Sequence, residues 1–155
     1  MDLIVQARWS RKEHFFLLNP MGTFKGHGGF IGISPMVSIS RGDERLGDIV
    51  VELLERSGPT GFHIREHFKY RSEIEDAKSR KLREFYIPKS ATTGSLSKRF
   101  VRLEISTTRA AKSWKLTRFE YDKLKKASFG VEQERIRFFD GTETLRERML
   151  SIVGE

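Results

Sequence analysis

Alternation of apolar and polar residues along two distant segments is the feature that most constrains this chain. Every second residue is apolar in residues 3–9 and again in residues 100–105, and the positions between them include charged side chains in the second segment. Such a period of two is typical of strands that bury one face and leave the other polar. The apolar positions are Leu3, Val5 and Ala7 in the first segment and Val101, Leu103 and Ile105 in the second.

A period near 3.6 residues predicts helices that could cover such a sheet. The clearest helix is expected over about Glu44–Ser57, where Asp43 would be the N-cap and Gly58 followed by proline would end it. A final helix is expected over about Glu143–Val153, capped by Thr142. The apolar stripe of the first helix comprises Leu46, Ile49, Val50, Leu53 and Leu54.

Shorter patterns complete the predicted secondary structure. Asn19-Pro20 indicates a turn after an apolar run, and Pro35 interrupts an extended segment, which predicts an edge strand, a bulged strand or two short strands. The remaining expectations are strands at Phe85–Ile87, Trp114–Phe119 and Ile136–Phe139, a loop at Ser90–Ser97 and a short helix at Tyr121–Ala127. Together the patterns predict an α/β fold of the α+β type, with a mainly antiparallel sheet, two or three packed helices and a single domain over residues 1–155.

Positive charge is concentrated in the second half of the chain. Residues 1–77 hold 10 Lys and Arg against 11 Asp and Glu, whereas residues 78–155 hold 19 against 10, within an overall formal charge of +8. This asymmetry indicates an acidic partner or serves solubility alone. The chain has no cysteine and no apolar run of about 20 residues, so we expect a cytoplasmic protein without disulfides or membrane spans.

Two short motifs could indicate chemistry, and both are weak. His63, Glu66 and His67 match the inverted zinc-peptidase pattern H-x-x-E-H, but no apolar helix supports them, and a solvated charged segment is favoured. The glycine-rich segment of residues 22–29 lacks the strand–turn–helix setting of a phosphate-binding loop and predicts a turn. We therefore expect a binding protein and not an enzyme, with no catalytic residue, no metal and no cofactor.

Basic residues of the second half are the candidate partner-binding residues. The aromatic side chains between them, at Phe100, Trp114, Phe119 and Tyr121, could form a stacking platform for single-stranded nucleic acid. They could equally lie in the core, with the basic residues on the polar faces of half-buried strands, which is the favoured interpretation. The candidate residues are Arg99, Arg102, Lys112, Lys115, Arg118 and Lys123.

The segment GGFIGISPMVSISRGDERLGDIVVELLERSG, from Gly28 to Gly58, resembles the contact-dependent growth inhibition immunity proteins. The similarity lies in Asp43, Leu46, Gly47 and the helix that follows, where glycine would allow close packing of helix on sheet. It implies a small cytoplasmic protein that binds one cognate toxin C-terminal domain, often a nuclease, and blocks it. A small basic nucleic-acid-binding protein is the alternative.

Overall fold

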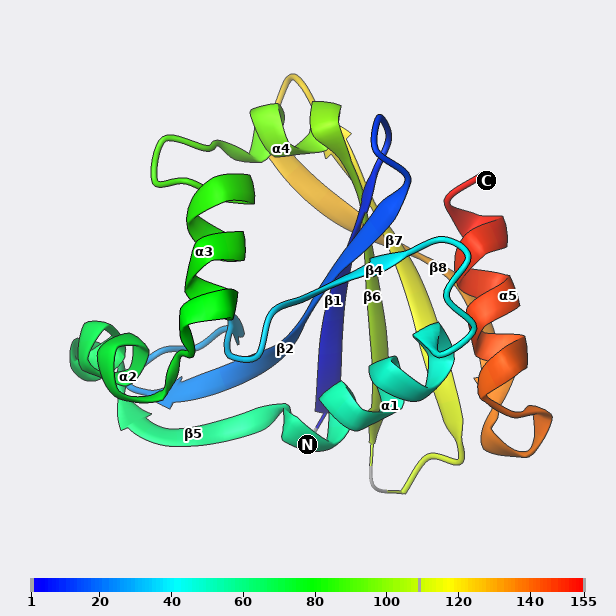
Figure 1. Ribbon diagram of the computed structural model, residues 1–155, viewed down its shortest axis with the longest axis horizontal. Coiled ribbons are helices and arrows are strands. Elements are labelled where there is room, and N and C mark those ends of the chain that lie inside the picture. Colours follow the sequence, from blue (N-terminus) through cyan, green and yellow to red (C-terminus); the bar gives the residue numbers. More distant parts are fainter. Residues whose placement is uncertain (1, 109, 155) are drawn as a thin grey trace.

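The architecture is a twisted antiparallel sheet with helices on both of its faces (Figure 1). The computed structural model describes residues 2–108 and 110–154. Over these residues, eight strands and five α-helices form one α+β domain, so the predicted fold class is confirmed. Within the same residues, no helix is long and apolar enough to span a membrane.

The elements follow one another along the chain with short connections. The strands are β1 (Asp2–Ser10), β2 (Phe15–Lys25), β3 (Ile31–Gly32), β4 (Val37–Ser40), β5 (Gly58–His63), β6 (Phe100–Thr108), β7 (Ser113–Asp122) and β8 (Ala127–Arg137). The helices are α1 (Leu46–Arg56), α2 (His67–Ile74), α3 (Ala77–Tyr86), α4 (Thr93–Arg99) and α5 (Thr142–Ile152), with single 3-10 turns at Ile64–Glu66 and Phe138–Asp140.

The sheet joins the two halves of the chain through its central pair of strands. Its order is β3-β2-β1-β6-β7-β8, with β4 and β5 also paired to β2, and β8 forms one edge. β1 and β6 pair antiparallel over nine residue pairs, from Asp2 opposite Thr108 to Ser10 opposite Phe100. The pairing of β2 with β5 is parallel. The strands predicted by alternation therefore lie side by side at the centre of the sheet.

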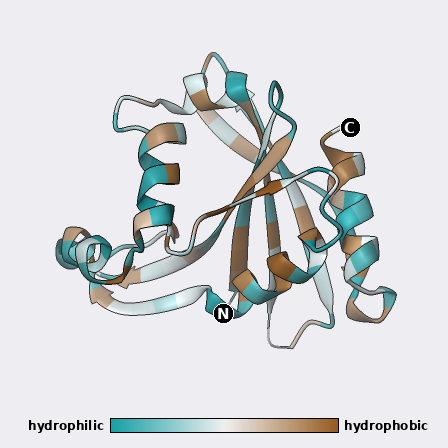
Figure 2. Ribbon diagram, viewed as in Figure 1, coloured by the Kyte–Doolittle hydropathy of each residue, from teal (hydrophilic) through white to brown (hydrophobic). Residues whose placement is uncertain are grey.

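The main core lies between the central strands and the helices α1 and α5. Figure 2 shows hydrophobic residues gathered where α1 crosses these strands. Both predicted apolar sets contribute, since Val5, Ala7, Leu103 and Ile105 are all fully buried there. The predicted stripe of the first helix also faces this core, through Leu46, Val50, Leu53 and Leu54.

Gly47 brings α1 and α5 into close contact. A Cβ atom at this position would clash with the carbonyl oxygen of Thr142. The expected role of Gly47 in helix–sheet packing is thus wrong, because its close neighbour is the first turn of another helix. Thr142 also donates a hydrogen bond from Oγ1 to Oδ1 of Asp48, at 2.6 Å.

Both predicted helix caps differ from the observed ones. The N-cap of α1 is Arg45, and Asp43 lies two residues before it. The Asp43 carboxylate accepts a hydrogen bond from the backbone N–H of Arg45 and forms an ion pair with the Arg45 side chain. Thr142 is the first residue of α5, whose N-cap is Gly141. Arg146 of α5 instead donates to the carbonyl oxygens of Arg41 and Asp43, so the capping groups tie the two helices together.

Four further predictions are wrong for local reasons. β2 continues through Asn19-Pro20 without a turn. Proline has no N–H to donate, and this is tolerated because β4 pairs with β2 only before the dipeptide and β3 only after it. Phe85 continues α3, and Ser90–Ser97 contains the start of α4, which a capping box between Thr92 and Ser95 begins. The predicted short helix at Tyr121–Ala127 is a tight turn between β7 and β8. Pro35 does separate two short strands, as one alternative proposed.

Replacing Gly47 with Ala should lower the free energy of unfolding by about 1–3 kcal/mol, since the added methyl group overpacks the α1–α5 contact. Gly42 supplies a matched control, because a Cβ there meets nothing within 4 Å and its backbone needs no positive φ. Urea unfolding followed by circular dichroism measures both changes. Equal stabilities for the two variants would show that the helices can separate without cost.

Candidate binding site

The sheet face opposite α1 and α5 is only partly covered. α3 packs over β2 and β4 through a small cluster that contains Phe15, Leu17 and Met36. On the same face, α4 lies over the ends of β6, β7 and β8 (Figure 1). Between these two helices, β1 and β6 present polar side chains, because the alternation that buries Val5 and Leu103 turns Arg8 and Arg102 to this face.

Arg8 and Arg102 are direct neighbours across the β1–β6 pair. Each guanidinium contacts a polar residue of its own strand: Arg8 Nη1 donates to Gln6 Oε1 at 2.6 Å, and Arg102 Nη2 lies 2.9 Å from Glu104 Oε1. The Arg102 guanidinium also lies over the ring of Phe119, 4.1 Å from its centroid. Like charges directly opposite one another destabilise a sheet, so this pair is a cost to the fold.

The electrostatics of Arg8 reflect that cost. Burial, together with the neighbouring charge of Arg102, lowers the pKa of Arg8 to about 10, while Glu104 opposes the shift. At neutral pH the guanidinium is still protonated, and it donates its hydrogen bond to the neutral amide of Gln6. The Nε atom of Arg102 is buried and makes no hydrogen bond within residues 2–108 and 110–154. Perturbed cations of this kind are found at binding sites more often than elsewhere.

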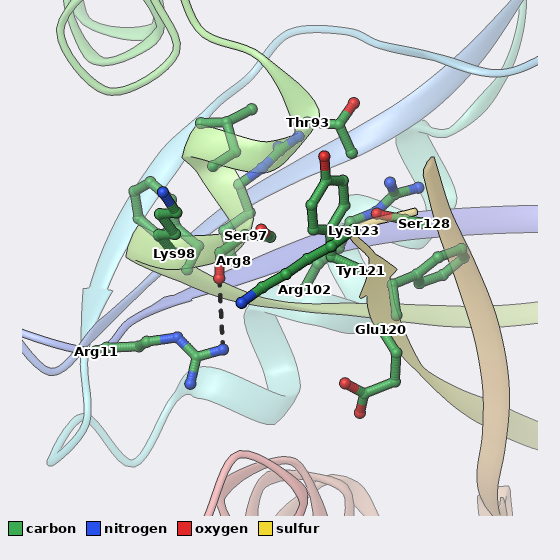
Figure 3. A pocket seen from close by; sticks show the side chains of 13 residues that line it. Arg8, Arg11, Thr93, Ser97, Lys98, Arg102, Glu120, Tyr121, Lys123 and Ser128 are labelled. Atoms are coloured by element: carbon green, nitrogen blue, oxygen red, sulfur yellow. Dashed lines mark hydrogen bonds between the residues drawn. The ribbon is translucent and has the colours of Figure 1, made fainter. Parts of the chain in front are cut away.

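A cavity of about 310 Å³ opens beside this pair, between α4 and the β7–β8 hairpin. Figure 3 shows its lining, in which side chains from β1, α4, β6 and β7 surround one space. Leu96, Phe100, Phe119 and Tyr121 supply its apolar surface, and Glu120 is its acidic residue. The cations that line it are Arg8, Arg11, Lys98, Arg102 and Lys123.

A second cavity, of about 330 Å³, lies on the other side of Arg8, toward α3. Arg71, Arg83 and Lys89 line it together with Arg8, and Gln6 and Asn19 form part of its polar surface. Arg83 is compensated by Glu75, with contacts of 2.7 and 2.8 Å, and this arginine lowers the pKa of the Glu75 carboxyl. Burial and the charge of Arg83 lower the pKa of Arg71. Both cavities are therefore predominantly cationic.

The six residues predicted to bind a partner do not form one patch. Arg102 and Lys123 line the first cavity, and Arg99 lies next to it, over the rings of Tyr86 and Phe100. Lys115 lines a separate hollow near the β6–β7 turn, and Lys112 lies in that turn. Arg118 is on the helix-covered face, where it donates to the carbonyl oxygen of Ile152 at 2.8 Å.

Sequence reasoning missed the residues that complete the site. Arg8 and Arg11 belong to the first half of the chain, which has no excess of positive charge. The alternation of residues 3–9 does place Arg8 on the polar face of its strand. Its position opposite Arg102 depends on the pairing of strands about 90 residues apart, which no local pattern predicts.

The predicted aromatic platform is only partly available. Trp114 and Phe100 are buried, at 6% and 2% exposure, as the favoured interpretation expected. Phe119 is covered on one side by the Arg102 guanidinium. Tyr121 lines the first cavity and is half-buried.

The H-x-x-E-H histidines have structural contacts. His63 Nδ1 accepts from the N–H of Arg65, and Glu66 accepts from the N–H of His63, which forms a capping box at the 3-10 turn. His67 begins α2, and its ring packs edge-on against Phe24 with a centroid distance of 5.1 Å. Among residues 2–108 and 110–154, no three His, Cys, Asp or Glu side chains are placed to hold a metal ion.

Similarity to known proteins lies at the level of the fold. The sequence matches no protein-family model, and no curated protein is similar to it. The structure is similar to that of a Neisseria meningitidis protein of unknown function, with a TM-score of 0.59 and 15% sequence identity. The match covers 95% of this chain and 90% of that protein. At this identity, the two proteins share an overall fold.

Stability should fall between pH 7.5 and pH 5 because of His67. Burial and the charges of Arg71 and Arg83 lower its pKa, so below the unfolded value near 6.5 the unfolded chain binds the proton more tightly than the folded one. At high pH, His67 is neutral in both states and does not affect the free energy of unfolding. As the pH falls through this window, protonation of the unfolded chain lowers that free energy. Replacing His67 with Phe keeps a ring against Phe24 and should flatten the loss, measured by urea midpoints at both pH values. A variant with the same pH slope as the natural protein would contradict this assignment.

Replacing Arg8 with Met should leave the stability unchanged or raise it by up to about 1 kcal/mol, because it removes one member of a half-buried like-charge pair and keeps apolar volume. The matched control is Arg118→Met, which removes the hydrogen bond to Ile152 and should lower the stability. Urea unfolding at pH 7 measures both. A loss of more than 1 kcal/mol in the Arg8 variant would mean that the pair supports the fold.

Proposed function

We propose that this chain is an immunity protein that binds a cognate toxin C-terminal domain and thereby neutralises it, as in contact-dependent growth inhibition. The observation that carries the proposal is the Arg8–Arg102 pair on a partly covered sheet face, in a cavity lined by five cations and one acid. Arginines that are costly in the free protein gain most from an acidic partner surface. The resemblance of the segment Gly28 to Gly58 supports a toxin as that partner.

The proposed contact surface suits stoichiometric inhibition. Arg8 and Arg102 stand on central strands, so their positions are fixed by the sheet and cost little ordering entropy when a partner binds. Lys98 and Lys123 are exposed at the mouth of the same cavity, where they would speed the approach of an acidic surface. Under this proposal, the protein acts in the cytoplasm and needs no catalysis of its own.

The alternative, a nucleic-acid-binding protein, has less support from this site. A single-strand platform needs exposed ring faces on which bases can stack. In the first cavity, Phe100 is buried and Phe119 is covered by Arg102, which leaves Tyr121 as the ring with a partly free surface. We therefore favour an acidic protein over a nucleic acid as the partner.

The test is a titration against the toxin domain encoded by the neighbouring gene. We expect a one-to-one complex with a Kd of about 1 nM or lower, since protection requires almost no free toxin. Lys123→Glu, in the β7–β8 turn, should slow association by about 10-fold at ~150 mM salt, because it reverses a charge at the cavity mouth.

Lys112→Glu is the matched control, because it makes the same charge change at an exposed lysine in the β6–β7 turn. Its association rate should stay within a factor of two of the natural protein. Tight binding of generic oligonucleotides, with no affinity for the neighbouring gene product, would overturn the proposal in favour of the alternative.

A further inference from the structure

Two cationic cavities meet at Arg8. Arg8 lines both the cavity beside α4 and the cavity beside α3, so the two are neighbours across its side chain. We call this combined depression the arginine trough, defined by Arg8, Arg11, Arg71, Arg83, Arg102 and Lys123. It crosses the sheet between α3 and α4, and its two parts measure about 310 and 330 Å³.

The positive charges of the arginine trough are unevenly compensated. Arg83 at one end has Glu75, and Arg102 has Glu104 at 2.9 Å. Arg8, where the two cavities meet, has the neutral amide of Gln6. Arg71 is held near Arg83 and half-buried, which lowers its pKa. Arg8, where the two cavities meet, is therefore among the cations of the trough that have no carboxylate within ion-pair distance in the described residues.

The shape of the arginine trough suits a chain segment more than a single side chain. Its two cavities lie on opposite sides of Arg8, and apolar side chains line both, with Met36 and Ile87 toward α3 and Leu96 toward α4. One carboxylate could occupy the space at Arg8, but it would leave both cavities empty. An extended segment with apolar and acidic residues would fill both cavities and cross Arg8.

We infer that an extended acidic segment of the partner protein binds along the arginine trough, with one of its carboxylates between Arg8 and Arg102. Guanidinium groups recognise carboxylates through charge-assisted hydrogen bonds, often two at a time. Here a carboxylate would accept from the guanidinium groups of Arg8 and Arg102, which both line the first cavity. The inference rests on the proposed function for the identity of the partner and adds the chemistry of the segment that it presents.

A fluorescently labelled peptide of twelve glutamates tests the arginine trough without the toxin. Anisotropy titrations at low salt should show binding that Arg8→Met weakens by about 10-fold, since one central charge-assisted contact is lost. Arg135→Met is the matched control: it makes the same substitution at an arginine that lines the hollow near the β6–β7 turn and pairs with Glu132. It should change the affinity by less than a factor of two.

Three results would overturn the inference. The first is an equal peptide affinity for the natural protein and Arg8→Met. The second is a loss of peptide affinity in Arg135→Met as large as in Arg8→Met, which would indicate general charge attraction. Tighter and Arg8-dependent binding of a twelve-nucleotide single strand would also do so, because the trough would then recognise phosphates.

Titrating the toxin domain with Arg8→Met separates this inference from the proposed function. A toxin complex that forms with the natural protein and is weakened by about 10-fold in Arg8→Met supports both. A toxin complex unaffected by Arg8→Met leaves the proposed function standing and overturns the inference. Arg8-dependent binding of the peptide by a protein without affinity for the toxin supports an acidic-segment site and overturns the immunity role.

Discussion

The pairing of β1 with β6 is the interaction on which the rest of the structure depends. It joins residues about 100 positions apart in the chain, and its register decides the environment of every side chain on both strands. In this register Val5 and Ala7 line the core with Leu103 and Ile105. The same register puts Arg8 beside Arg102 on the other face, so one set of backbone hydrogen bonds creates both the core and the candidate site.

The two faces of the sheet have opposite energetic roles. The face beneath α1 and α5 is closely packed, and the absence of a side chain at Gly47 lets the two helices touch. The other face carries a like-charge pair and a buried guanidinium atom with no hydrogen bond among the described residues. A well-packed core can offset such a local cost, and a binding site gains from groups that the free protein leaves poorly satisfied.

Local patterns were sufficient for the elements that depend on burial. Alternation placed both central strands, and the stripe from Leu46 to Leu54 placed the helix that covers them. Elements defined by pairing or by polar caps were predicted less well, as α4 and the continuous β2 illustrate. For the candidate site, charge clustering identified Arg102 and Lys123, while Arg8 escaped because its importance comes from a neighbour distant in sequence.

The closure of the core by the last helix has a consequence for synthesis. As the ribosome extends the chain, β1, β2, β4 and α1 emerge long before β6 and α5, their partners in the core. The early segment therefore presents an unpaired strand edge and an incomplete apolar layer until about two thirds of the sequence has followed. Because the native core depends on contacts between segments distant in sequence, we expect slow folding, and a chain that has not yet made them exposes this surface to chaperones and to aggregation.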